Sequence, residues 1–193
     1  MHAKAMAVLA FTSLWACSAH RGANEGEAAA QRGMGGSGLA QGAPAPGNRK
    51  YVDPHLGFEV AQPAGGDWHL DASGDSNEEG IAVPVVLRHR GGAQVVVQVA
   101  PPIATPTQFA ERLSSGLRSY QGFTATEPEP LPFSDDAVGF RFSMEDRLRG
   151  RIAVRPGIGN VLMVVATWPI DASDGVTAEV DQILGSVRPV PAS

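Results

Sequence analysis

The segment TPTQFAERLSSGLRSYQG, residues 105–122, carries the clearest helix signals in the chain and separates two groups of strand-like segments. Thr105 can cap the helix, Pro106 suits its first turn and Gln108 completes a capping box. Apolar and aromatic side chains then recur along one helical face: Phe109, Leu113, Leu117 and Tyr120. The pattern predicts an amphipathic helix that ends at Gly122 and packs on a sheet.

Strand patterns precede this helix. Alternating or β-rich stretches occupy residues 56–60, 68–70, 81–89 and 93–100. The last two are separated by Arg-Gly-Gly, which predicts a hairpin. Residues 71–80 (DASGDSNEEG) predict a polar, acidic loop. Pro84 predicts that its strand begins late or lies at an edge of the sheet, because proline cannot donate to a strand ladder.

Further strand patterns and a second helix follow. The strand-like stretches are 123–127, 137–144, 149–155 and 161–168, and the last is the most apolar, which predicts a central position in the sheet. Ser173 or Asp174 can cap the second helix. Its apolar stripe comprises Val176, Val180, Ile183, Leu184 and Val187. The order strands, helix, strands, helix, with hairpin-like connections, predicts an α+β fold with a mostly antiparallel sheet.

Three short motifs carry a resemblance to a known family. They are GF.V..P...W (Gly57, Phe58, Val60, Pro63, Trp68), FAERL (109–113) and ILGSV (183–187). With these motifs, residues 51–188 resemble the PsbP/Mog1/DcrB-like domains, which also occur in small exported bacterial lipoproteins. The resemblance implies an α/β/α sandwich, here with about six or seven strands and two main helices. It implies binding, chaperone or assembly roles more than catalysis.

The first residues have the pattern of an export signal. Residues 5–15 form an apolar run that is too short to span a bilayer as a helix. Leu14-Trp15-Ala16-Cys17 resembles the bacterial lipobox, although Trp15 is bulkier than the residue usual there. The resemblance implies a lipoprotein signal peptide over residues 1–16 and a diacylglyceryl group, with palmitate-type chains, on Cys17. Ordinary cleavage after Ala16 or Ala19 is the alternative.

The segment that follows predicts a tether and a location. Residues 17–50 are rich in Gly and Ala and poor in large apolar residues, which is typical of a disordered linker. Residues 51–193 then form a single α+β domain of ordinary size. These features predict a lipid-anchored protein of the bacterial cell envelope. Ser18, where an aspartate would favour inner-membrane retention, favours the outer membrane and its periplasmic side.

Charge and cysteine content exclude several classes of function. The domain carries ten basic and eighteen acidic residues, and this excess of negative charge disfavours nucleic acid as a partner. Cys17 is the single cysteine, so the domain has neither a disulfide framework nor a cysteine-based metal site. The spacing of the histidines and carboxylates matches no metal motif, and no nucleophile motif is present. The sequence therefore predicts no cofactor and no catalytic residues.

Two groups of residues are candidates for binding. Trp68 and His69 could line the mouth of a pocket, although Trp68 is also a natural core anchor at a strand end. Arg147, Arg149 and Arg151 alternate along one predicted strand, so their side chains share a face. They could bind an anionic ligand or an acidic partner, because guanidinium groups grip carboxylates and phosphates. The alternative is an exposed sheet face whose charge nearby acids balance.

These observations lead to two main hypotheses on function. The first is a non-enzymatic, lipid-anchored envelope protein that binds or assembles with a protein partner. The second is a carrier or sensor that holds a small amphiphile between sheet and helix. A hydrolase is a third class, which no motif supports. A surface patch over a filled core favours the first, whereas an apolar pocket of about 300–1,000 Å³ favours the second.

Overall fold

The computed structural model describes residues 49–65, 67–76 and 80–191. The predicted signal peptide, Cys17 and nearly all of the predicted tether lie outside these described residues. Lys50, the last residue of that tether, already belongs to the first strand, β1 (Lys50–Asp53). Within the described part of the chain, no helix has the length and apolar character needed to cross a membrane.

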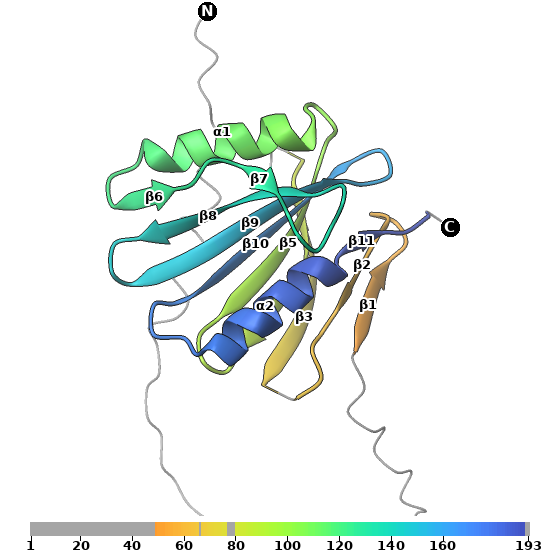
Figure 1. The fold of residues 1–193 in the computed structure, drawn as a ribbon. Coiled ribbons are helices and arrows are strands. Elements are labelled where there is room, and N and C mark those ends of the chain that lie inside the picture. The colour runs from red at the N-terminus through yellow and green to blue at the C-terminus, as the bar shows by residue number, and fades with distance from the viewer. Residues whose placement is uncertain (1–48, 66, 77–79, 192–193) are drawn as a thin grey trace, which may run out of the picture. The chain divides into compact units, whose positions relative to one another are not determined.

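An antiparallel sheet of eight strands forms the centre of the fold (Figure 1). Across the sheet the order is β3-β4-β5-β10-β9-β8-β6, and β7 also pairs with β8. The strands are β3 (Trp68–Ser76), β4 (Ala82–His89), β5 (Gln94–Ala100), β6 (Phe123–Ala125), β7 (Glu129–Pro130), β8 (Val138–Met144), β9 (Leu148–Pro156) and β10 (Val161–Pro169). The most apolar strand, β10, lies in the middle, as the sequence predicts.

Two helices cover opposite faces of this sheet. Helix α1 (Pro106–Arg118) lies over β6, β8 and β9, while α2 (Asp174–Ser186) lies over β10 and reaches β2 (Phe58–Ala61). Alternate strand residues divide between the two faces, so Val164 shares a core with Ile183 of α2. The layers are therefore helix, sheet and helix, and the predicted α+β sandwich is confirmed (Figure 1).

A second, small sheet joins the two ends of the described chain. It consists of β1, β2 and β11 (Arg188–Pro189), with β2 in the middle and both pairings antiparallel. Asn160 Nδ2, in the turn between β9 and β10, donates to the carbonyl of Leu56 at 2.8 Å. The small sheet is thus fastened to the end of the main sheet, and Phe58 and Val60 enter the core under α2.

Helix α1 begins as predicted but ends earlier. Thr105 Oγ1 accepts from the N–H of Gln108, and the Gln108 side chain accepts from the N–H of Thr105, which completes the capping box. The helix ends at Arg118, not at Gly122, and Tyr120 lies beyond it with 47% of its surface exposed. Gly122 instead takes φ +85° in the turn into β6, a conformation that glycine adopts without strain.

The predicted loop at residues 71–80 is wrong for its first half. Strand β3 continues to Ser76 and pairs with β4 throughout, with an irregularity between Ala72 and Asp75. In this edge strand the side chain of Asp71 remains 40% exposed. Asp71 also forms an ion pair with Arg88 across the two strands. Local polarity therefore indicated a loop where sheet pairing forms a strand.

Pro84 lies inside the sheet, not at its edge. Strand β4 has β3 on one side and β5 on the other, and the register shifts around Pro84 in both pairings. At such a shift the strand ladder does not require a backbone N–H donor at that position, so proline, which has none, is tolerated. The edge prediction failed because it took no account of a bulge.

Candidate ligand-binding groove

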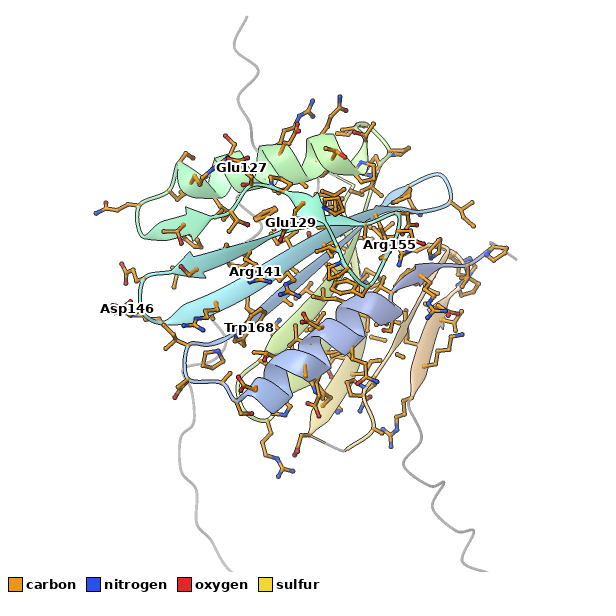
Figure 2. All side chains as sticks on the ribbon, in the orientation of Figure 1. Glu127, Glu129, Arg141, Asp146, Arg155 and Trp168 are labelled. Atoms are coloured by element: carbon orange, nitrogen blue, oxygen red, sulfur yellow. The ribbon has the colours of Figure 1, made fainter. Side chains whose placement is uncertain are left out.

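Helix α2 covers only part of its face of the sheet. The parts of β9 and β8 nearest the turn at residues 145–147, together with β6, remain open on that face. Strand pairing places two rows of side chains across this open area. The first row is Trp168, Arg149, Ser143 and Thr124, and the second is Ala166, Arg151, Arg141 and Thr126. Figure 2 shows Arg141 and Trp168 on the sheet face that α2 leaves uncovered.

Apart from Ala166, which is fully buried, these residues form the floor of a groove of about 580 Å³, hereafter the arginine groove. Its wall comes from the β10–α2 loop and the first turns of α2, namely Ile170, Ala172, Asp174, Thr177 and Asp181. Hydroxyl groups line the far side of the floor, where the Oγ atoms of Thr124 and Ser143 lie 2.7 Å apart. The groove thus combines guanidinium groups, hydroxyl groups and the indole of Trp168.

The three arginines of the groove differ in their partners. Arg151, whose side chain is only 14% exposed, forms an ion pair with Asp181 of α2. Arg141 and Arg149 are exposed, and no carboxylate among the described residues lies within ion-pairing distance of either. Arg141 and Arg151 are direct cross-strand partners. Like charges placed opposite each other destabilise a sheet, so this arrangement is not explained by folding alone.

The structure brings together two of the three predicted arginines. Arg149 and Arg151 share a face of β9, as their spacing predicts. Arg147 precedes β9 in the turn, where its Nε lies 3.8 Å from Glu145 Oε2, and it does not line the groove. Its expected place beside the other two is taken by Arg141 of β8. Spacing within one strand could not find Arg141 in that role, because the pairing of β8 with β9 brings it there.

Trp68 and His69 lie at a second cavity, of about 560 Å³, at the end of β3 and β4. Trp68 is 4% exposed and belongs to the core, and its Nε1 donates to Glu179 Oε2 of α2 at 2.8 Å. His69 is exposed, with Nε2 2.9 Å from Asp71 Oδ1. Trp68 is therefore a core residue that also borders a cavity, so the pocket-mouth and core-anchor interpretations of Trp68 do not exclude each other.

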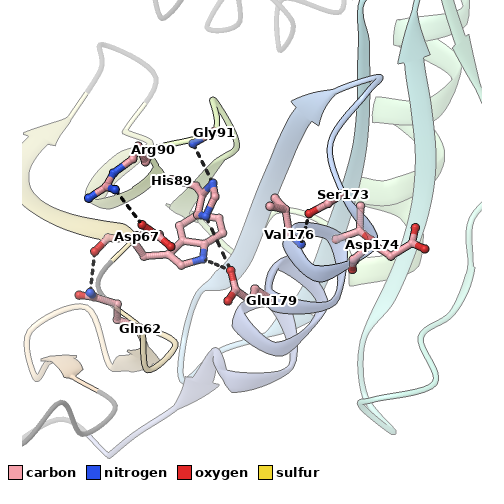
Figure 3. A network of polar contacts seen from close by, with 11 residues as sticks. Gln62, Asp67, His89, Arg90, Gly91, Ser173, Asp174, Val176 and Glu179 are labelled. Atoms are coloured by element: carbon pink, nitrogen blue, oxygen red, sulfur yellow. Dashed lines mark hydrogen bonds and ion pairs between the residues drawn. The ribbon is translucent and has the colours of Figure 1, made fainter.

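His89 completes a polar contact between α2 and the strands (Figure 3). The N–H of Gly91 donates to His89 Nδ1 at 2.9 Å, so the neutral ring carries its proton on Nε2. That nitrogen lies 3.9 Å from Glu179 Oε2, and the ring centroid is 5.1 Å from that of Trp68. This arrangement holds α2 to β3 and β4. No sequence pattern indicated this arrangement, because its residues are far apart in the chain.

Arg155 lies on the same face of β9 as Arg149 and Arg151, but its guanidinium group has partners within the fold. Its side chain is 13% exposed and donates to the Val187 carbonyl and to Asp136 Oδ1. Burial raises the pKa of Asp136, but hydrogen bonds from Ser134 and Arg155, with the charge of Arg155, outweigh this and hold it below the ordinary value. Arg155 of β9 therefore links the C-terminal end of α2 to the loop before β8.

The described residues offer no metal centre, since nowhere among them do three histidine, cysteine, aspartate or glutamate side chains gather at one point. The groove itself presents cationic donors and hydroxyls, which suit the binding of anions. Its carboxylates are Asp181, which is paired with Arg151, and Asp174 at the start of α2. The arrangement can therefore hold an anionic group in place.

Comparisons with known proteins place the fold. No family model matches the sequence, and no curated protein sequence matches it. Among solved structures, cyanobacterial PsbP from Synechocystis sp. PCC 6803 has a TM-score of 0.50 and 17% identity, over 82% of this chain and 98% of that one. A Mog1 variant gives 0.48 and 8% identity over 75% and 97% of the two chains. LpqN, involved in cell envelope biogenesis of Mycobacterium tuberculosis, gives 0.46 and 14% over 74% and 91%.

The similarity to cyanobacterial PsbP extends over almost the whole of that protein, and at this identity it establishes the fold alone. The resemblance in the sequence motifs pointed to the same fold. The described part of the chain is thus a domain with the PsbP/Mog1-type fold.

Proposed function

We propose that the protein is a non-enzymatic, lipid-anchored component of the bacterial cell envelope that binds an acidic region of a partner protein. The binding surface is the arginine groove. The observation that carries this proposal is the pair of exposed guanidinium groups, Arg141 and Arg149, which have no carboxylate partner in the described part of the chain. Charges that folding does not use are available for a ligand.

The charge of the rest of the domain sharpens this proposal. The domain carries eighteen acidic and ten basic residues, so its overall field repels an acidic partner. An approach that presents the partner's acids to the groove is locally attractive. A local cationic site on an acidic surface therefore favours specific docking over non-specific adhesion.

The proposed location rests on the N-terminal segment. Lipidation of Cys17 and a tether over residues 17–50 would hold the domain about 30 Å from the membrane. This reach suits contact with envelope proteins at the periplasmic side of the outer membrane. The test of the anchor is the intact mass of the protein from its own envelope, which should equal Cys17–Ser193 plus acyl groups. A lipid-free mass with another N-terminus would contradict it.

A small anionic amphiphile is the second candidate for the same groove. The groove volume of about 580 Å³ falls within the usual range for small ligands, about 300–1,000 Å³. Ile170, which is 39% exposed, and Trp168 supply apolar surface beside the arginines. The groove lies beside α2 and is open, whereas the space directly under α2 is filled by buried side chains such as Ile183. A carried ligand would therefore sit at the edge of the helix.

A photo-crosslinking experiment in the native envelope tests the proposed function. Benzoylphenylalanine replaces Thr124, on the groove floor, or Thr107, which is also exposed but lies on α1 at the opposite face. We expect a discrete protein adduct from position 124 alone, and its loss when Arg141 and Arg149 are changed to glutamine. A lipid adduct at position 124 would favour the amphiphile instead. Equal adducts at both positions, or none, would overturn the proposal.

A further inference from the structure

We propose that the arginine groove recognises an extended acidic peptide segment whose two carboxylates stand at positions i and i+2. This inference rests on the proposed function and names the chemistry of the partner. It follows from three features of the groove: the spacing of its two unpaired arginines along the sheet, the ion pair that already engages its third arginine, and the mixture of apolar and polar groups in its floor and wall.

The spacing of the free arginines matches that of side chains on one face of an extended peptide. Arg149 is the diagonal neighbour of Arg141, since Arg141 pairs directly with Arg151, two residues further along β9. Diagonal neighbours in an antiparallel pair lie about 7–8 Å apart. In an extended chain, side chains at i and i+2 are separated by about 6.6 Å. One carboxylate can therefore meet each guanidinium group.

The same spacing disfavours a single compact anion. Arg141 and Arg149 stand in different rows on different strands, so their side chains leave the sheet from two separate points. Arg151, which lies next to Arg149 on that face of β9, is already held by Asp181. The N-terminus of α2 borders the groove, but Ser173 Oγ already accepts from the N–H of Val176 and Asp174 supplies negative charge. A phosphate group would lack a converging set of donors there.

The wall and the far side of the floor suit a peptide. Trp168 is the cross-strand partner of Arg149, so an apolar residue of the segment can pack beside a bound carboxylate. Thr124 and Ser143 offer hydroxyl groups to the remaining carboxylate oxygens or to the peptide backbone. Asp174, on the wall, can accept from backbone N–H groups of the segment but would repel a third acid.

Isothermal titration of the full chain in detergent with synthetic peptides tests this inference. The probes are three acetylated and amidated peptides: Ala-Glu-Val-Glu-Ala, its isomer Ala-Glu-Glu-Val-Ala, and Ala-Gln-Val-Gln-Ala. We expect the first to bind about tenfold more tightly than its isomer, in which one carboxylate is misplaced, and about a hundredfold more tightly than the glutamine peptide, in which both charge-assisted contacts are lost. Inorganic phosphate serves as the competing compact anion and should not displace the first peptide.

Variants separate the groove from general charge. Arg141→Gln and Arg149→Gln should each weaken binding of the first peptide about tenfold, while Arg147→Gln, outside the groove, should leave it within twofold. Equal binding of the two isomers, displacement by phosphate, insensitivity to both groove variants, or no binding at all would each overturn the inference. If the peptide result contradicted the inference but the protein with unchanged arginines still gave a protein adduct at position 124, the proposed function would stand with a different partner chemistry. If no adduct formed either, both the inference and the proposed function would be wrong.

Discussion

The sheet face beneath α2 has two halves that differ in composition and in covering. Under the helix, alternate residues of β4, β5 and β10 are apolar and fully buried: Val85, Leu87, Val95, Val97, Leu162 and Val164. Beyond the edge of the helix, the same face presents arginines, hydroxyls and one indole. The change occurs within continuous strands, since β10 runs from buried Leu162 to half-buried Trp168. One half is specified by packing, whereas the other also carries two exposed arginines, Arg141 and Arg149, with no carboxylate partner among the described residues.

Two arginines of β9 illustrate the same contrast. Arg155 and Arg149 lie on the same face of one strand. Arg155 is nearly buried, and its two terminal nitrogens donate to the Val187 carbonyl and to Asp136. Arg149 is exposed and faces the groove. Residue type alone therefore does not indicate function: the partners of each guanidinium group decide whether it serves stability or binding.

The largest expected effect on stability comes from the half of the sheet face that α2 covers. Ile183 of α2 is fully buried in the core, so Ile183→Ala should lower the free energy of unfolding by about 2–5 kcal/mol through lost burial and the cavity left behind. Urea denaturation followed by circular dichroism measures this. The exposed Gln182 gives the matched control, since Gln182→Ala should change stability by less than about 0.5 kcal/mol. A small effect at Ile183 would mean that the covered half is not a packed core.

Gly150 gives the next largest effect, because it lies between the two groove arginines of β9. A Cβ atom there would come within 2.2 Å of Phe142 Cζ and 2.8 Å of the Ala166 carbonyl oxygen. Gly150→Ala should therefore cost about 1–3 kcal/mol as the aromatic ring and strands shift. At Gly175, in the first turn of α2, an added Cβ would meet only Ser173 Oγ, at an ordinary contact distance of 3.7 Å, so Gly175→Ala should be neutral or slightly stabilising in the same denaturation assay. Equal effects at the two glycines would contradict the close approach.

Asp136 links stability to pH through its pair with Arg155. Its pKa is lower in the folded protein than the ordinary 3.8, so this contribution is complete above that value and disappears as the pH falls through the lower folded value. Because the carboxylate is 43% exposed, we expect only about 0.5–1 kcal/mol from the pair. Asp136→Asn should remove this amount at neutral pH and flatten the fall in stability as the pH drops below about 4. An unchanged acid profile in thermal unfolding would count against the pair.

The smallest expected effect on stability is at the groove itself. Arg141 has no ion-pair partner among the described residues and stands opposite Arg151, so Arg141→Gln should change stability by no more than about 0.5 kcal/mol, towards greater stability. Arg155→Gln, made for comparison, should destabilise the protein because Asp136 and the Val187 carbonyl lose their donor. Thermal unfolding of the two variants under identical conditions measures the difference. A large loss of stability in the Arg141→Gln variant would mean that Arg141, like Arg155, serves the stability of the fold.

Most of the fold could be predicted from the sequence, because periodicity and capping are local signals. The capping box at Thr105 and the apolar stripe through Ile183 both form as expected. The errors arose where distant pairing decides the outcome. Strand β3 extends through a polar stretch, and Pro84 is accommodated by a bulge that no local pattern indicates. The small strands β7 and β11 were missed for the same reason.

The groove could be predicted only in part. Alternation along β9 identified Arg149 and Arg151 as neighbours, but it also included Arg147, which the turn before β9 removes from that face. Arg141 joins the groove through cross-strand pairing, and Asp181 forms an ion pair with Arg151 because α2 lies beside β9. A sequence gives the number of arginines in such a segment. Which of them remain unpaired depends on the tertiary structure.

The most direct test of the account measures stability and binding together in the Arg141→Gln, Arg149→Gln double variant. We predict that its free energy of unfolding equals or exceeds that of the unchanged protein, within about 0.5 kcal/mol. The protein adduct at position 124 should disappear at the same time. A loss of more than about 1 kcal/mol of stability, or retention of the adduct in a fully folded variant, would contradict the claim that these arginines serve binding and not folding.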